Sequence, residues 1–159
     1  PNTREDYVYI QDLRKKWIID VKENFYPDDF ITRAEFTKII TLWTMWINYQ
    51  KIDWFNSFND VSKDDWFYPY VQSARYYHFI KWYPNWKFKP WNNINRAEAI
   101  KIILKATWLD LSYNSTHFRD FSDSEWFSKY ANSAFEYWIF EWKIWKNWLP
   151  QWLFWQRKM

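Results

Sequence analysis

The sequence predicts an all-α fold built from helix–loop–helix repeats, and three observations predict it. The chain of 159 residues is 48% hydrophobic and 26% charged, which is typical of a packed globular domain. Apolar residues recur with a helical period, and strand-like alternation is scarce. The chain also aligns with itself at offsets of 60 to 63 residues, which indicates a repeat architecture.

The first helix of each repeat, called the A helix, is predicted three times. Residues 64–82 align with residues 124–142 at an offset of 60, so that Trp66 falls on Trp126. Residues 5–19 fit the same pattern, at an offset of 61 from the second copy.

The second helix, called the B helix, is predicted twice, because residues 31–43 align with residues 94–106 at an offset of 63. The order A, B, A, B, A divides the chain into repeats over residues 1–52, 53–116 and 117–159. The third repeat stops before a third B helix. We therefore expect two nearly complete repeats and a truncated one, packed as a pseudo-threefold helical bundle.

Capping boxes predict where helices begin. Each box has an N-cap side chain that accepts a hydrogen bond from the N3 backbone, and an N3 glutamate that reaches back to the N-cap N–H. The predicted boxes are Thr32 with Glu35, Asn95 with Glu98, and Ser122 with Glu125. In the second A helix, Pro69 would cost a hydrogen bond if the helix began at Ser62, so we place its first residue near Trp66.

Glycine is absent from the chain, and tryptophan is in excess. Average composition predicts about eleven glycines, whereas the chain has none and has 16 tryptophans. Several tryptophans lie where the chain should turn: Trp17 and Trp138 directly follow A helices, and Trp82 and Trp86 flank a tight loop. The residue after a helix commonly takes a left-handed conformation that favours glycine. His78 is the aligned residue in the second repeat.

Five motifs carry a resemblance to a known family. They are FNDVSKDDWFYPYV (58–71), WYPNWKFKP (82–90), ITRAE (31–35), INRAE (94–98) and FRDFSDSEWF (118–127). Together they resemble the S-layer homology domain, a family of helix–loop–helix repeats normally found in threes. The resemblance runs over nearly the whole chain. Trp66 and Trp126 match tryptophans of the family, whereas positions that are usually glycine hold tryptophan here.

Two hypotheses explain the remaining tryptophans, which number fourteen when Trp66 and Trp126 are subtracted from 16. In the first, which we favour, UGA codons that the source organism reads as glycine were decoded as tryptophan. In the second, the tryptophans are real and form an aromatic surface that stacks on sugars or single-stranded nucleic acid. Indole at several left-handed positions would cost about 1–2 kcal/mol each.

Composition argues against several functional classes. The net charge of +3, from 22 basic and 19 acidic residues, does not favour nucleic acid as a partner. There is no cysteine, and two isolated histidines cannot form a zinc site. No motif indicates an enzyme, a cofactor or a metal. No apolar run is long enough to span a membrane, and we expect an export signal to lie outside this segment.

The arginines that follow two of the helix caps are candidate ligand-binding residues. A cation in the first helical turn opposes the helix macrodipole, so the presence of Arg33 and Arg96 at helix starts needs an explanation. A guanidinium at a helix N-terminus is a good receptor for carboxylate or phosphate. A structural ion pair is the alternative. The acidic residues around Asp60 and Asp120 lack the spacing of a calcium loop, and helix-start acids are favoured anyway.

Aromatic and basic side chains supply further candidates. Trp66 and Trp126 are expected on the buried side of the A helices, as core residues or as platforms for a sugar ring. Lys87 and Lys89 lie in a basic and aromatic loop that is either solvated or helps to hold an anionic glycan.

The resemblance implies a function. In S-layer homology domains this arginine lies in grooves between repeats and contacts acidic, often pyruvate-substituted, wall glycan. Arg33 and Arg96 would then bind an acidic cell-wall polysaccharide or a peptidoglycan-linked polymer, and the chain would anchor an exported protein non-covalently at the cell surface. The alternative is a structural or self-association module of a surface layer that does not bind glycan directly.

Overall fold

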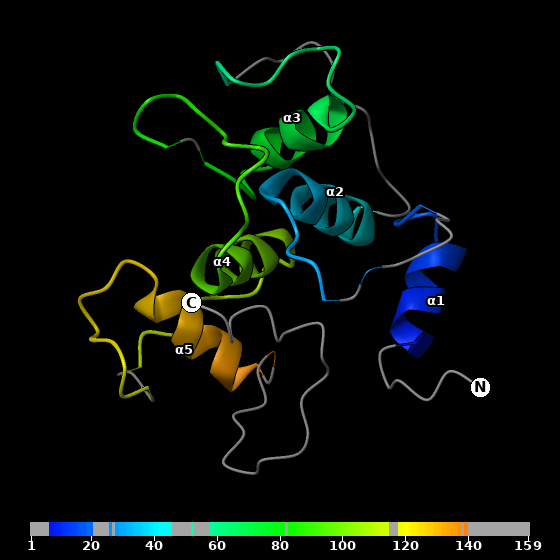
Figure 1. Ribbon diagram of the computed structural model, residues 1–159. Coiled ribbons are helices and arrows are strands. Elements are labelled where there is room, and N and C mark those ends of the chain that lie inside the picture. The colour runs from blue at the N-terminus through cyan, green and yellow to red at the C-terminus, as the bar shows by residue number, and fades with distance from the viewer. Residues whose placement is uncertain are drawn as a thin grey trace.

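The computed structural model describes residues 7–20, 26, 28–45, 52, 58–81, 83–114, 118–137 and 139. This part of the chain holds five helices and no strand: α1 (Tyr7–Lys15), α2 (Arg33–Thr44), α3 (Tyr68–Tyr76), α4 (Arg96–Ala106) and α5 (Ser128–Glu136) (Figure 1). The predicted fold class is therefore confirmed, and the helices follow the order A, B, A, B, A. None of the described helices has the length and apolarity that a membrane span requires.

Both B helices begin where the sequence predicts. At α2 the Thr32 hydroxyl accepts the Glu35 N–H at 3.3 Å, and the Thr32 N–H donates to the Glu35 carboxylate at 2.9 Å. At α4 the Asn95 side chain accepts the Glu98 N–H at 2.9 Å, and the Asn95 N–H donates to Glu98. Each box satisfies two of the N–H groups that a helix start leaves without partners.

The prediction that Ser122 and Glu125 form a capping box is wrong, because α5 begins only at Ser128 and its N-cap makes no side-chain hydrogen bond. The Glu125 N–H donates to the Ser122 carbonyl at 3.1 Å, and the Ser122 hydroxyl lies 2.6 Å from the Ser124 hydroxyl. A second turn follows, in which the Ser128 N–H donates to the Glu125 carbonyl at 3.0 Å. Local hydrogen bonds of serine compete with helix initiation here.

Each later A helix packs against the B helix of the preceding repeat. Helix α3 packs on α2, α5 packs on α4, and the two B helices α2 and α4 pack on each other. In Figure 1 these helices follow one another down the view in the order α3, α2, α4, α5. Contact between two B helices is expected for a bundle built on B helices. The third repeat beyond residue 139 lies outside the described residues, so the threefold arrangement and the repeat boundaries stay predictions.

The largest hydrophobic core lies between α2, α3 and α4. Its centre is formed by Phe67, Phe79 and Phe88, which are at most 2% exposed. Burial of one such side chain stabilises the fold by about 1.5–3 kcal/mol. A smaller cluster under α5 includes Leu104 and Ala134. Helix α1 contains no buried residue, so the described core is formed by the other four helices and by loop residues around them.

Three tryptophans have a left-handed backbone. Trp17, Trp86 and Trp108 have φ angles of 56°, 59° and 56°, and His78 has 65°. The Trp17 N–H donates to the Arg14 carbonyl at 3.0 Å in the turn that ends α1, and His78 makes the equivalent bond after α3. The left-handed conformation predicted for Trp17 and His78 is confirmed. Trp82 and Trp138 lie outside the described residues.

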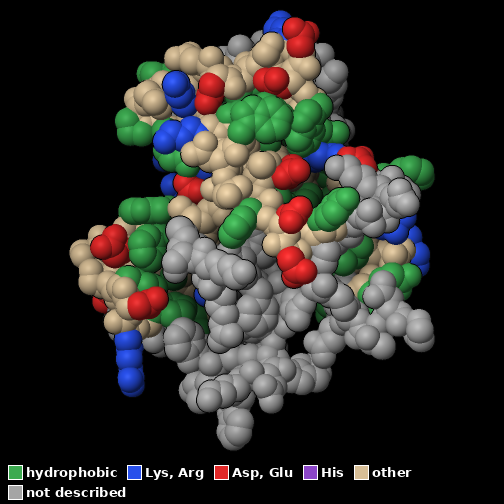
Figure 2. Space-filling view, viewed as in Figure 1, with side chains coloured by type: hydrophobic (Ala, Val, Ile, Leu, Met, Phe, Trp, Pro, Cys, Tyr) green, Lys and Arg blue, Asp and Glu red, His purple; other side chains and the backbone are tan. Residues whose placement is uncertain are grey.

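These indoles are also exposed. Trp17 is 81% exposed, Trp108 is 72% exposed and Trp86 is 54% exposed, so they contribute little apolar burial to offset the cost of the backbone conformation. Figure 2 shows hydrophobic side chains interspersed with charged ones on the face of the molecule that it displays. A left-handed backbone and an exposed side chain are both typical of positions where glycine would be favourable.

Candidate functional site

The junction between the first two repeats brings the start of α2 against the loop that precedes α4. The Arg33 N–H donates to the Asn92 carbonyl at 2.8 Å, and the Ala34 N–H donates to the Pro90 carbonyl at 3.0 Å. Thr32 and Asn93 form an isolated antiparallel bridge. The loop of the second repeat therefore satisfies free N–H groups at the start of the first repeat's B helix.

The side chain of Arg33 is enclosed in this junction and is only 6% exposed. Its guanidinium carbon lies 5.1 Å from the ring centres of both Tyr83 and Phe88. Its Nη1 atom lies 3.7 Å from the Glu98 carboxylate. The Arg33 Nε is buried without a hydrogen-bond partner in the described structure. Ring faces and one long ion pair thus compensate the buried charge while donor capacity remains unused.

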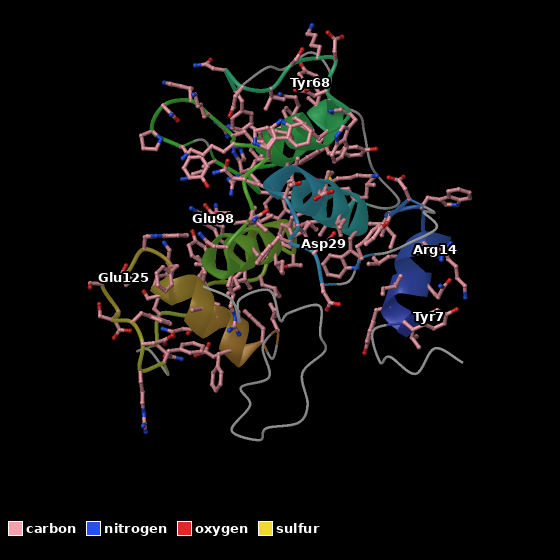
Figure 3. The ribbon with its side chains drawn as sticks, viewed as in Figure 1. Tyr7, Arg14, Asp29, Tyr68, Glu98 and Glu125 are labelled. Atoms are coloured by element: carbon pink, nitrogen blue, oxygen red, sulfur yellow. The ribbon has the colours of Figure 1, made fainter. Side chains whose placement is uncertain are left out.

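Tyr83 links this arginine to the next helix. Its hydroxyl donates to the Oε1 of Glu98, a residue that lies at the start of α4 (Figure 3). Burial, followed by this hydrogen bond, raises the pKa of Tyr83 to about 12. The Lys89 ammonium lies 4.4 Å from the centre of the same ring. Two cations from different repeats, Arg33 and Lys89, therefore share one tyrosine ring.

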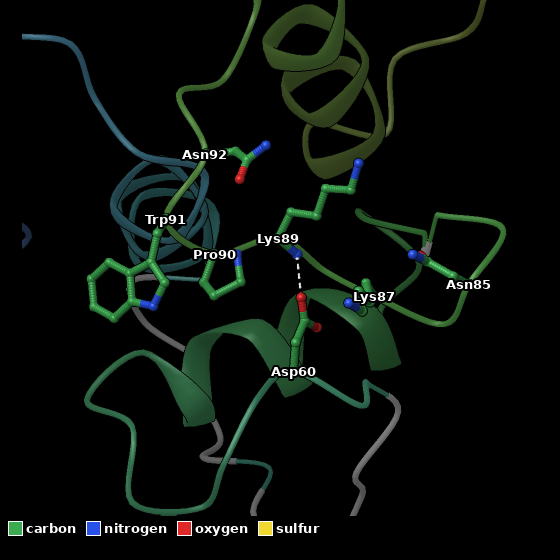
Figure 4. Close-up of a pocket in the computed structure, with 7 residues that line it drawn as sticks. All are labelled: Asp60, Asn85, Lys87, Lys89, Pro90, Trp91 and Asn92. Carbon is green, nitrogen blue, oxygen red and sulfur yellow. Dashed lines mark hydrogen bonds between the residues drawn. The ribbon is translucent and has the colours of Figure 1, made fainter.

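Asp60 holds the loop in place. Its carboxylate accepts the N–H groups of Phe88 at 2.7 Å and Lys89 at 2.8 Å. Lys89 has a φ angle of 59°, so the two bonds support a left-handed residue that would otherwise be unfavourable. The same carboxylate faces an open pocket, shown in Figure 4, that is lined by Asp60, Asn85, Lys87, Lys89, Pro90, Trp91 and Asn92. The predicted residues Lys87 and Lys89 thus line one pocket together with Pro90 and Asn92, whose carbonyls accept the first N–H groups of α2.

Arg96 occupies the equivalent position at the start of α4 but is exposed. Partial burial of its guanidinium lowers its pKa, and the negative charge of Asp120 in the third repeat acts in the opposite direction. The two arginines therefore have different surroundings in the described structure, since Arg33 is enclosed.

The predicted tryptophans Trp66 and Trp126 are not on the buried side of their helices, as they are 48% and 51% exposed. They precede α3 and α5, whose N-caps are Phe67 and Phe127, and Phe67 takes the buried place in the second repeat. Each indole packs edge-on against that phenylalanine. About half of each tryptophan is therefore accessible.

Each of these tryptophans has a lysine ammonium over its ring, and neither lysine was predicted from the sequence. The Lys38 ammonium of α2 lies 5.8 Å from the Trp66 ring and 5.9 Å from the Tyr70 ring. In the next repeat, the Lys101 ammonium of α4 lies 4.9 Å from Trp126 and 5.7 Å from Tyr130. Because 101 minus 38 equals the B-helix offset of 63, the repeat alignment was a signal that could have identified both lysines.

The structure thus separates the predicted residues into two kinds of place. Arg33, Lys87 and Lys89 gather at the junction of the first two repeats, while Trp66 and Trp126 lie beside the lysines of the B helices. Within the described part of the chain, no group of three His, Cys, Asp or Glu side chains is arranged to hold a metal ion. The acidic residue Asp60 has a structural role in the loop.

Comparisons with known proteins agree with the repeat pattern. The model of a family described as "S-layer homology domain" matches residues 7–37 and 57–100. A protein named "Surface layer protein" from Brevibacillus choshinensis is 36% identical over 84 residues, which is 52% of this chain and 8% of that protein. A "Middle cell wall protein" from Brevibacillus brevis is 35% identical over 80 residues, which is 50% of this chain and 8% of that protein. The similarity therefore covers a small part of each relative.

Proposed function

This chain belongs to the S-layer homology domain family, and we propose that it anchors an exported protein to the cell envelope by gripping acidic wall polysaccharide between its repeats. Its relatives are named as a surface layer protein and a cell wall protein, and we assign this chain to the same location, the cell surface. The family is a non-enzymatic anchoring module, so the function is binding and not catalysis.

The observation that supports the proposal is the unused hydrogen-bonding capacity of the Arg33 guanidinium. A guanidinium has five N–H donors, and in the described structure this one makes a single ion pair of 3.7 Å and leaves Nε without a partner. A buried cation with unused donors is stabilised by an anion that approaches it. A sugar carboxylate, such as a pyruvate substituent, has the planar geometry that suits a guanidinium.

The surroundings of Arg33 favour a sugar over a simple ion. Lys87, Lys89, Asn85 and Asn92 line the adjacent pocket, which supplies cations and amide groups for hydroxyl and carboxylate oxygens. The exposed indoles of Trp66 and Trp126 offer flat apolar faces for sugar rings. Arg96 is the equivalent cation at the next junction. Recognition would rest on charge, hydrogen bonding and stacking.

One observation favours a second candidate function, a self-association module that does not bind glycan. The Arg33 guanidinium already contacts Glu98 of the following repeat, so the arginine has a structural partner inside the chain. In this alternative the two RAE arginines hold repeats together, and the outer surface contacts other copies of the chain.

Co-sedimentation with purified wall sacculi of Brevibacillus brevis separates the two functions. We expect the parent chain to pellet with sacculi, and the variant that combines Arg33→Ala with Arg96→Ala to stay in solution. The matched control combines Arg14→Ala with Lys15→Ala, which removes the same charge from α1. Circular dichroism of each variant reports whether the helices persist. Arg33→Lys, which keeps the charge but not the fork, should weaken binding.

The same assay also tests whether the unusual tryptophans affect binding to the sacculi. The assay is repeated on a chain with glycine at all tryptophans except Trp66 and Trp126, where pelleting should persist. If the folded double-arginine variant pellets as well as the parent in both backgrounds, the arginines are not the glycan contacts. In that case sedimentation equilibrium, which reports self-association, tests the alternative.

A further inference from the structure

In the second repeat, one carboxylate holds a loop in place. The Asp60 carboxylate accepts the N–H groups of Phe88 and Lys89 at 2.7 Å and 2.8 Å, and Figure 4 shows the second of these bonds. The Phe88 ring lies 5.3 Å from the Phe58 ring, and both rings belong to the largest core. We call the residues that receive this loop the second socket, and they are Phe58, Asp60, Val61 and Phe67.

The third repeat contains a socket of the same kind. At the A-helix offset of 60, its residues are Phe118, Asp120, Phe121 and Phe127, which we call the third socket. The Phe121 ring lies 5.1 Å from the Phe118 ring and 4.9 Å from the Phe127 ring. Three aromatic rings in contact and one carboxylate thus precede α5.

The two sockets differ in exposure. The apolar residues of the second socket are at most 4% exposed, whereas the three phenylalanines of the third socket are only partly buried and Asp120 is exposed. The loop on the second socket consists of residues 83–90. Its counterpart at the same offset, residues 143–150, lies outside the described residues. A partly exposed cluster of rings favours a segment that covers it.

The sequence of residues 143–150 suits the third socket. At the offset of 60, Trp148 falls on Phe88 and Pro150 falls on Pro90. Residues 148 and 149 each have a backbone N–H that can donate to a carboxylate, as the corresponding residues of the second repeat do. These two donors are the same if residue 148 is glycine, so they do not depend on the codon hypothesis.

The segment is also tethered at a suitable distance from the third socket. In the second repeat, 12 residues separate Tyr76, the last residue of α3, from Phe88. In the third repeat, the same number separates Glu136, the last residue of α5, from Trp148, because 88 minus 76 equals 148 minus 136. A segment that is tethered this closely has a high effective concentration at its binding place. The tether favours it over a segment of another molecule.

We propose that residues 143–150 dock on the third socket, with the N–H groups of residues 148 and 149 donating to the Asp120 carboxylate and with the side chains of the segment covering the three phenylalanines. The docked segment also reaches the start of α4, because the centre of its counterpart ring, Phe88, lies 5.1 Å from the Arg33 guanidinium carbon at the start of α2. The third repeat then holds its loop as the second repeat does, without a B helix in the described residues. The inference involves no ligand and goes beyond the proposed anchoring function.

Limited digestion of the full chain with trypsin, followed over time by mass spectrometry, measures docking as the rate of cleavage after Lys143. Asp120→Ala should raise this rate by about tenfold, because two charge-assisted hydrogen bonds are lost and the undocked population, which trypsin cleaves, grows. Glu125→Ala is the matched control, since it removes the same charge from an exposed residue of the same repeat, and it should leave the rate within about twofold of the parent. Cleavage after Lys105 in α4 should stay equally slow in all variants, so lost docking is not lost folding.

The backbone donors are tested separately. Leu149→Pro removes one of the two N–H groups, so it should raise the rate as Asp120→Ala does. The two changes combined should add little, because both break the same contact. Gln151→Pro is the matched control, since it leaves both donors in place. Trp148→Gly should keep the dependence on Asp120, because glycine carries the same N–H.

Each result decides the assignment. Protection of Lys143 that requires Asp120 and the N–H of residue 149 at every protein concentration establishes the docking. If Asp120→Ala is cleaved at the same rate as Glu125→Ala, or if Leu149→Pro leaves the rate unchanged, the segment does not dock on the third socket. If protection rises with protein concentration, the socket holds the segment of a second copy, and docking within one chain is wrong.

Discussion

The Nη1 atom of Arg33 lies 3.7 Å from the Oε1 atom of Glu98, so the RAE motifs of consecutive repeats contact each other directly. Glu98 also closes the capping box of α4 through its other oxygen, and it accepts the Tyr83 hydroxyl. One carboxylate therefore joins the start of α4 to the start of α2. This relationship makes Glu98 a side chain that couples the two repeats, in addition to the backbone hydrogen bonds from Arg33 and Ala34 to the loop before α4.

Replacement of Glu98 by glutamine should destabilise the fold by about 1–3 kcal/mol, because it leaves the buried Arg33 without its counter-charge. Glutamine can still close a capping box, so the loss reports the contact between repeats. Glu35→Gln is the control, since Glu35 closes the equivalent box on an exposed surface, and it should cost about 0.5 kcal/mol or less. Urea unfolding gives both values. Equal losses in the two variants would contradict the coupling.

The stability of the chain should fall between about pH 10 and pH 12 because of Tyr83. Its pKa is raised from 10.0 to about 12, so the folded state holds the phenol proton more tightly than the unfolded chain does. This contribution is complete below pH 10 and is lost as the pH rises through about 12. Tyr83→Phe should therefore show a flatter stability profile in this window than the parent. A profile parallel to that of the parent would contradict the assignment.

Glycine should stabilise the chain at the left-handed tryptophans and destabilise it elsewhere. We expect Trp86→Gly, at a φ angle of 59°, to raise the free energy of unfolding by about 1–2 kcal/mol. Trp43→Gly, in the last turn of α2, should lower it by about 1 kcal/mol, since its backbone is helical. Thermal unfolding of the two variants compares the positions. A loss of stability in Trp86→Gly would show that its indole has a packing role.

The mass of one peptide tests the codon hypothesis directly. Trypsin cleaves after Lys81 and Lys87 and releases residues 82–87, which contain Trp82 and Trp86. From the source organism we expect the mass that corresponds to glycine at both positions. The mass of the tryptophan peptide would instead show that the indoles are real and would favour an aromatic binding surface.

Local features such as helix caps were predictable from the sequence, whereas contacts between repeats were not. The starts of α2 and α4 were predicted to the residue, because Thr32 and Asn95 form caps whose partners lie three residues away. The start of α5 was missed because the Ser122 hydroxyl contacts Ser124, an alternative that the motif does not reveal.

The candidate site shows the same division. The sequence singled out Arg33 for its unfavourable place in the macrodipole, but its enclosure between Tyr83 and Phe88 depends on how a distant loop packs, which an alignment of repeats does not give. The lysines Lys38 and Lys101 were within reach of the sequence, since they share a position in the B helix. Their contacts with tryptophans of the next repeat follow only from packing.

The packing of α3 on α2 and of α5 on α4 means that the unit of duplication and the unit of close helix packing are not the same. A duplicated segment runs from an A helix to the following B helix, whereas a packed pair consists of a B helix and the A helix that comes after it. Cutting the chain at a repeat boundary would split such a pair and expose the apolar faces of both helices to water. Truncated chains that preserve a folded core should therefore keep each B helix with the A helix that follows it, and should keep α2, α3 and α4 together, because the largest core lies between them.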